Sequence, residues 1–176
     1  MAWFDLIPTC GFKQTMHRAH SALKLTTHYK LGEGGFNPIK PLTPQCDCSG
    51  FIAWAIGIPR EFPPGSNKWL STTEYYAGGA PVLPGLLSQV ELHQARAGDL
   101  LVYPHQNGQV GHIALISEVS DGQPAGILHC SSGNYKNFGN AVKITSPAVF
   151  FETKQTTRIM RINYPVLTQL VNVEYE

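Results

Sequence analysis

The segment PQCDCSGFIAWAIG, residues 44–57, places a cysteine directly ahead of a long apolar run. We interpret residues 47–56 as a buried helix, because Asp47 suits the N-cap position and Gly57 suits the position just past the helix end. Cys48 then lies at the start of the helix, where backbone N–H groups have no partner within the helix. A cysteine inside the run would be core packing. At this position a reactive thiol is favoured.

Length and composition indicate one domain. The chain has 176 residues, of which 43% are hydrophobic and only 14% are charged, and its formal net charge is +1. This charge balance gives no electrostatic basis for a nucleic-acid partner or an anionic membrane surface. We expect a single domain over residues 1–176, with an N-terminal helical extension (1–27), a core (28–163) and a tail (164–176).

The first residues, MAWFDLIPTCGFKQ, show no basic region followed by an apolar stretch, so they do not resemble an export signal. No segment approaches the 18 apolar residues of a membrane span. We therefore expect a soluble protein that is cytoplasmic or exported by a specialised secretion route. The four cysteines are expected to be free thiols, because a chain of this size does not need disulfides; they are Cys10, Cys46, Cys48 and Cys130.

The order of predicted elements indicates an α+β fold. Amphipathic spacing predicts a helix over residues 13–27, and the Pro- and Gly-rich segment 59–97 leaves room for one short helix at 71–76. Strand patterns follow, and the connections between them are too short for crossover helices. We therefore predict N-terminal helices packed on a central antiparallel sheet of about five strands, at residues 99–103, 112–119, 125–130, 140–145 and 157–163.

Two histidines occur in neighbouring predicted strands. His112 and His129 flank a turn signal at residues 121–124, and a hairpin centred there makes them cross-strand neighbours within a rung or two. One imidazole could then orient the other, as nucleophilic catalysis requires of a base and its orienting group. A helix N-terminus and a nearby imidazolium both lower a cysteine pKa, so we expect a lowered pKa for Cys48.

Four motifs occur in one order along the chain: DCSGF (47–51), RAGDLLVY (96–103), GHIALI (111–116) and ILHCSSG (127–133). Together they resemble the motifs of the NlpC-type cell-wall peptidases, which are papain-like cysteine hydrolases of bacteria. The resemblance covers about residues 28–162, the core, which would then be catalytic. It implies that Cys48 is the nucleophile, His112 the base and His129 the third, orienting residue.

The same resemblance extends to HYKLGEGG at residues 28–35, which is similar to the tyrosine-containing stretch ahead of the family's cysteine. It implies that the Tyr29 hydroxyl lies near the oxyanion, and we group Ser49 with it as an oxyanion or substrate-binding residue. The family cleaves amide bonds in peptidoglycan stem peptides, so a peptide substrate is implied. No cofactor and no metal are implied.

Other readings of these residues remain open. The same fold could serve an amidase or acyltransferase on a substrate outside the wall, or a binding module without catalysis. A metal site is conceivable because cysteine and histidine are ligand types, but the single residue between Cys46 and Cys48 is poor spacing for zinc. Cys46 is expected to be structural and Cys130 to pack in the core. If the protein is a secreted effector, an immunity protein would be its partner.

Overall fold

The computed structural model describes residues 11–36, 44–152 and 156–174. Cys10 and the first ten residues of the predicted helical extension lie outside these ranges. The chain folds around a six-stranded antiparallel sheet with strand order β3-β8-β4-β5-β6-β7. Its strands are β3 (Leu87–Val90), β4 (Leu100–Tyr103), β5 (His112–Ser120), β6 (Gln123–Cys130), β7 (Val142–Thr145) and β8 (Arg158–Ile162).

The predicted α+β class is confirmed, and all five predicted strands are present. The sixth strand, β3, lies in the segment 59–97 that the sequence marked as connection, and it pairs with β8 at one edge of the sheet. A separate two-stranded parallel sheet joins β1 (His28–Tyr29) to β2 (Gln45–Cys46). Strands of two residues carry too little periodic pattern to be read from sequence.

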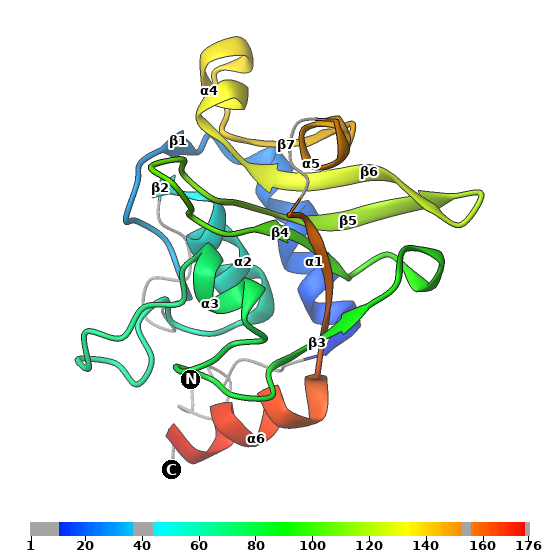
Figure 1. The fold of residues 1–176 in the computed structure, drawn as a ribbon. Helices are drawn as coiled ribbons and strands as arrows, with labels where there is room; N and C mark the ends of the chain where they lie inside the picture. The colour runs from blue at the N-terminus through cyan, green and yellow to red at the C-terminus, as the bar shows by residue number, and fades with distance from the viewer. Residues whose placement is uncertain (1–10, 37–43, 153–155, 175–176) are drawn as a thin grey trace.

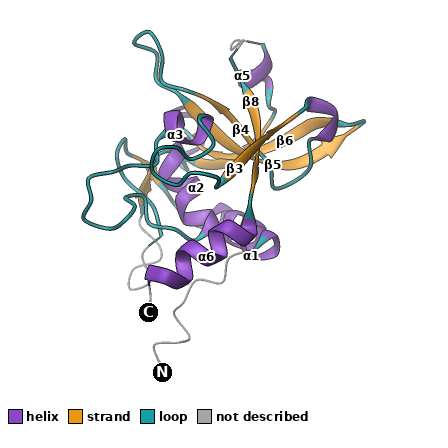
Figure 2. Ribbon diagram, turned by 60° about the horizontal axis from the view of Figure 1, so that its bottom comes forward, coloured by secondary structure: helices purple, strands orange, loops and turns teal. Residues whose placement is uncertain are grey.

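The helices gather mainly on one side of the sheet (Figures 1 and 2). The helix predicted at 13–27 is shorter, because it gives way to a 3₁₀ turn, Ala22–Lys24, and Leu25 is already extended. The predicted tail forms a helix over most of its length. The α-helices are α1 (Phe12–Ser21), α2 (Cys48–Ile56), α3 (Thr72–Tyr76), α4 (Ser132–Phe138), α5 (Ala148–Phe151) and α6 (Tyr164–Glu174).

Helix α2 has the boundaries that its sequence predicts. The Asp47 carboxylate accepts a hydrogen bond from the Gly50 N–H at 2.9 Å, and Gly57 ends the helix in the left-handed region at φ 84°. Eight of its nine residues are buried. A helix that is apolar on all sides has to lie inside the protein, and α2 packs between α1 and the sheet, where its first residue is held against β5.

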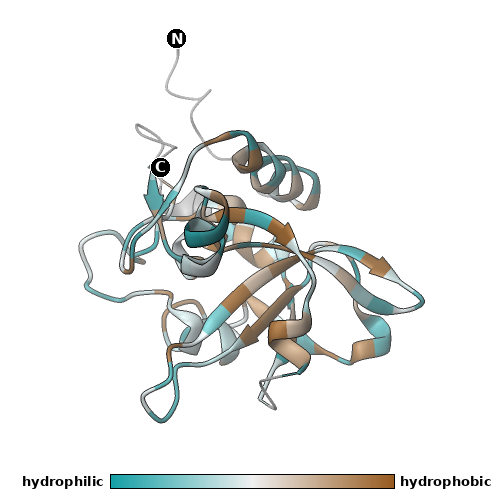
Figure 3. Cartoon of the chain, turned by 90° about the horizontal axis from the view of Figure 1, so that it is seen from above, coloured by the Kyte–Doolittle hydropathy of each residue, from teal (hydrophilic) through white to brown (hydrophobic). Residues whose placement is uncertain are grey.

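Alternate residues of the central strands face two different cores, as the pleat requires. One core lies against α1 and α2 and contains Leu100, Val102, Ile113, Leu115, Leu128 and Cys130. The other lies beneath α5 and contains Leu101, Tyr103, Ala114, Ile116, Ile127 and Phe150. Hydrophobic residues accordingly recur along the central strands (Figure 3).

Within the described ranges no helix has the length and apolar character needed to cross a membrane. The same ranges contain no group of three or more His, Cys, Asp or Glu side chains arranged to hold a metal ion.

Candidate active site

Cys48 is the first residue of α2, and its side chain meets the start of β5. The thiol receives hydrogen bonds from the backbone N–H groups of Ile113 and Ser49. Ile113 directly follows His112 in the chain, so the sulfur lies beside the backbone that carries this histidine. Cys48 is only 4% exposed, yet it lines a surface pocket of about 290 Å³. The thiol is therefore buried from bulk solvent but open to this pocket.

The walls of this pocket come from segments far apart in sequence. Helix α2 and its N-cap form one part, and the loops before α3 and before β5 form the others. The lining residues are Leu31, Asp47, Cys48, Ser49, Arg60, Ser71, Thr72, His105, Val110 and Gly111. Gly111 is required here, because a Cβ at this position would come within 2.2 Å of Thr72 Oγ1.

A buried ion pair holds the start of α2 in place. Asp47 is 1% exposed, and its Oδ1 accepts from Arg60 Nη1 at 2.6 Å. The same carboxylate accepts from the Gly32 N–H at 2.8 Å and from Ser49 Oγ at 3.1 Å. Arg60 also donates to the Glu33 carbonyl and to Ser49 Oγ. The Asp47 carboxylate thus fixes both the start of α2 and the loop that precedes it.

The two predicted histidines are in direct contact. His112 Nε2 lies 2.7 Å from His129 Nδ1, and the rings meet edge to face. In the hairpin Leu115 pairs with Leu128, so the histidines are diagonal neighbours rather than direct partners. Both project from the face of the sheet that carries Phe150, against which the His112 ring stacks. The cross-strand prediction is confirmed.

The hydrogen-bond network assigns the ring protons. Thr145 Oγ1 donates to the Ser146 carbonyl and therefore accepts from His129 Nε2 at 2.9 Å. His129 Nδ1 is then the acceptor for His112 Nε2–H, which leaves the lone pair on His112 Nδ1. Asn134 Nδ2 also approaches His129 Nε2, but its two hydrogens have acceptors in the carbonyls of His129 and Ala141. His112 is thus held in a form that can accept a proton at Nδ1.

The expected lowering of the Cys48 pKa is not what the structure gives. Burial raises the pKa of Cys48 to about 12, and the adjacent Asp47 charge adds to this, whereas the two backbone N–H bonds and Arg60 act in the opposite direction. Burial, with a contribution from His129, lowers the pKa of His112 to about 3. The resting protein therefore holds a neutral thiol and a neutral imidazole, because desolvation penalises both charged forms.

This protonation state predicts how Cys48 reacts with iodoacetamide. The thiolate is the reactive form, so below pH 9 the alkylation rate should rise about tenfold per pH unit without a plateau. Mass spectrometry can follow the rate for the Cys48 peptide itself, with the fully buried Cys130 as an internal comparison. A rate that is flat from pH 5 to 8 would instead show a thiolate–imidazolium pair.

The histidine pair also predicts a dependence of stability on pH. Burial lowers the pKa of His129 from 6.5 to about 4. Between these two pH values the unfolded chain binds more protons than the folded chain. The contribution of His129 to the free energy of unfolding is therefore fully present above pH 6.5 and is lost as the pH falls towards 4. His129 alone should account for about 3 kcal/mol.

Urea unfolding at half-unit steps from pH 7.5 to 4.5 measures this loss, and a comparison of variants separates it from carboxylates, which begin to titrate at the acid end of this range. The slope of the free energy of unfolding against pH should be smaller in His129→Gln. The control His105→Gln changes an exposed histidine and should keep the native slope. Equal slopes in all three proteins would contradict the assignment.

The other two predicted site residues lie near the thiol. Tyr29 belongs to β1, opposite Cys46, and burial together with the proximity of Cys48 raises its pKa well above the ordinary value. Its hydroxyl is therefore a hydrogen-bond donor at neutral pH. Ser49 is 3% exposed and holds its hydroxyl between Asp47 and Arg60. Its side chain thus supports the helix start, and its N–H faces the sulfur.

Several residues of this region could not be recognised in the sequence. Nothing in the sequence marks Arg60 or Asn134 for these contacts, and Thr145 ends a predicted strand that gives no sign of its contact with His129. His105 is exposed, and it also lines the pocket. The one sequence feature that could have indicated Arg60 is its position, because it is a basic residue shortly after the apolar helix that ends at Gly57.

Comparison with solved structures found nine chains that resemble this one. No family model matches this chain, and no match was found among curated proteins. A crystal structure from Staphylococcus aureus, described as similar to lipoprotein of the NLP/P60 family, superposes with a TM-score of 0.48 and 20% sequence identity. The superposition covers 88% of this chain and 43% of that one. This chain thus spans less than half the length of that protein.

Proposed function

We propose that this protein is a cysteine hydrolase, an endopeptidase or amidase that cleaves amide bonds in bacterial peptidoglycan stem peptides through a thioester on Cys48. The observation that carries the proposal is the position of the thiol. It lies at a helix N-terminus, lines an open pocket, and is bonded to the N–H that follows His112. The wall substrate rests on the four sequence motifs and their resemblance to the NlpC-type peptidases.

The first step is attack of the Cys48 sulfur on the scissile carbonyl. Because thiol and imidazole are both neutral at rest, His112 Nδ1 takes the thiol proton as the carbon–sulfur bond forms. The imidazolium that results is stabilised by His129, whose Nδ1 accepts from His112 Nε2–H at 2.7 Å. Thr145 in turn fixes the His129 ring. The histidine pair therefore acts as a base with its orienting group.

The tetrahedral intermediate places negative charge on the former carbonyl oxygen. The backbone N–H of Cys48 and the Tyr29 hydroxyl are the donors proposed to stabilise it. His112 then returns its proton to the leaving amine, and the thioester forms. Water, deprotonated by His112, attacks the thioester and releases the carboxylate and the free thiol. Each step uses residues of this chain alone.

Digestion of purified peptidoglycan and of its soluble stem peptides tests the proposal. Native protein should release a new amine and a new carboxylate at one amide bond, detected by mass spectrometry, and Cys48→Ala should release neither. A matched control is Cys46→Ala, which removes a thiol two residues away. Transfer of the acyl group to an added amine would indicate an acyltransferase, and the absence of any product would favour another substrate or a binding module.

A further inference from the structure

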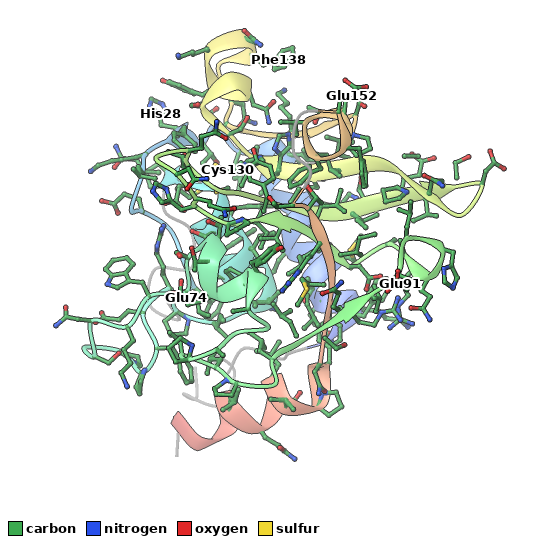
Figure 4. All side chains as sticks on the ribbon, in the orientation of Figure 1. His28, Glu74, Glu91, Cys130, Phe138 and Glu152 are labelled. Atoms are coloured by element: carbon green, nitrogen blue, oxygen red, sulfur yellow. The ribbon has the colours of Figure 1, made fainter. Side chains whose placement is uncertain are left out.

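Two further thiols lie in contact where the small sheet meets the central sheet. Cys46 ends β2 and Cys130 ends β6, and their sulfur atoms are 3.2 Å apart although 84 positions separate them in sequence. Cys46 is 7% exposed and Cys130 is fully buried. Figure 4 labels Cys130 at the end of its strand, close to the segment that leads into α2. Both are free thiols in the structure.

The backbone around the pair is held by hydrogen bonds on both sides. Cys46 pairs with Tyr29 in the parallel sheet, and Cys130 pairs with Val142 in the central sheet. The Cys46 thiol donates to the Cys130 sulfur, and the Cys130 thiol donates to the Cys46 carbonyl at 3.3 Å. A disulfide needs a sulfur separation of about 2.05 Å, so the two sulfurs have to approach by roughly 1.2 Å.

A small pocket reaches one member of this pair, Cys46. It has a volume of about 20 Å³ and is lined by Cys46 together with Ala22, Thr27, Phe51 and Val142, among others. About 10–15 Å³ is enough to hold one water molecule. A larger oxidant such as a peptide disulfide does not fit, but hydrogen peroxide is only slightly larger than water.

We propose that Cys46 and Cys130 are a redox-reactive pair that hydrogen peroxide converts into a reversible disulfide. One thiol attacks the peroxide, the O–O bond breaks, and a sulfenic acid and one water are formed. The second thiol then attacks that sulfur, and the hydroxyl leaves with the thiol proton as a second water. In total, two thiols and one hydrogen peroxide give one disulfide and two waters.

The disulfide would connect the two halves of the candidate active site. Cys46 lies two residues before Cys48, and Cys130 directly follows His129, so the bond joins the strand that leads to the thiol with the strand that carries the orienting histidine. It also closes a loop of more than 80 residues, which restricts the unfolded chain more than a short loop does. The oxidised protein should therefore be more stable. This inference does not depend on the proposed function.

The test treats the native protein with hydrogen peroxide, blocks the remaining thiols by alkylation after unfolding, and maps the peptides without reduction. We expect a Cys46–Cys130 crosslink with the loss of two hydrogens, and a rise in melting temperature of about 5–15 °C that dithiothreitol reverses. Cys130→Ser should show neither change. Cys48→Ser, the matched control, should show both.

Two results would overturn the proposal. One is that Cys46 and Cys130 are both recovered as alkylated thiols at peroxide concentrations that oxidise Cys48. The other is that the crosslink joins either of them to Cys48. Peptide mapping is done on the native chain, so the test does not require the serine variants to fold.

Discussion

Replacing His112 by alanine is expected to lower kcat/KM for stem-peptide cleavage by about 1000-fold. The structure leaves the lone pair of His112 on Nδ1, and the resting thiol keeps its proton because burial raises its pKa to about 12. His112 is the group proposed to take that proton. The rate should fall mainly in kcat, because the proton transfer occurs in the transition state and not on binding.

The pocket offers its own control for this experiment. His105 lines the pocket but is exposed, and His105→Ala should retain kcat within about threefold. His129→Ala should give an intermediate loss of about 10- to 100-fold, because His112 keeps its nitrogen but loses the partner that fixes its tautomer. A larger loss of kcat for His105→Ala than for His112→Ala would show that His112 is not the base.

The largest effect on stability is expected for Asp47→Ala, which should lower the free energy of unfolding by about 3–5 kcal/mol. The change removes the N-cap of α2 and leaves the Arg60 guanidinium, whose side chain is 10% exposed, without its carboxylate. It also leaves the Gly32 N–H without its acceptor. A loss of this size is a large fraction of the usual stability of a domain.

Urea unfolding of three further variants separates these contributions. Asp47→Asn keeps an acceptor for the helix N–H groups and should lose less than the alanine variant. The double variant Asp47→Ala/Arg60→Met removes the unpaired charge and should recover part of the loss. Glu118→Ala changes an exposed acid on β5 and should stay within about 0.5 kcal/mol of the native protein. If Asp47→Ala matched Glu118→Ala, the ion pair would have no structural role.

The parts of the fold that were predicted correctly are those with local signals. Asp47 and Gly57 lie at the two ends of an apolar run. Asp47 caps the helix start and Gly57 ends the helix in the left-handed region, so both ends of α2 could be predicted. The β5–β6 hairpin could be predicted because side chains of alternating character lie on both sides of a turn signal. These two elements bring the thiol and both histidines to one region, and they depend on little beyond their own sequences.

The parts that were missed depend on contacts between distant segments. The two-residue strands β1 and β2 exist only because they pair, and β3 is a strand because β8 offers an edge. Arg60 reaches Asp47 across a turn without regular structure, and Cys130 meets Cys46 from 84 positions away. No local pattern encodes such contacts, because the residues involved are compatible with many other positions.

The Cys48 pKa shows how a correct position can still give a wrong electrostatic prediction. The helix N-terminus and its N–H groups do favour the thiolate, as expected from the sequence. Burial and the neighbouring Asp47 charge outweigh them. The degree of burial depends on how α2 packs on the sheet, and that packing is not readable from residues 44–57 alone.

The most direct test of the account is to trap the acyl-enzyme. Protein and stem peptide are mixed, quenched with acid within the first turnover, and digested, and the Cys48 peptide is weighed by mass spectrometry. The account predicts that this peptide carries the acyl half of the substrate and that the adduct disappears as product accumulates. Product formation with an unmodified Cys48 peptide at every quench time, and at the same rate after Cys48 has been alkylated, would contradict it.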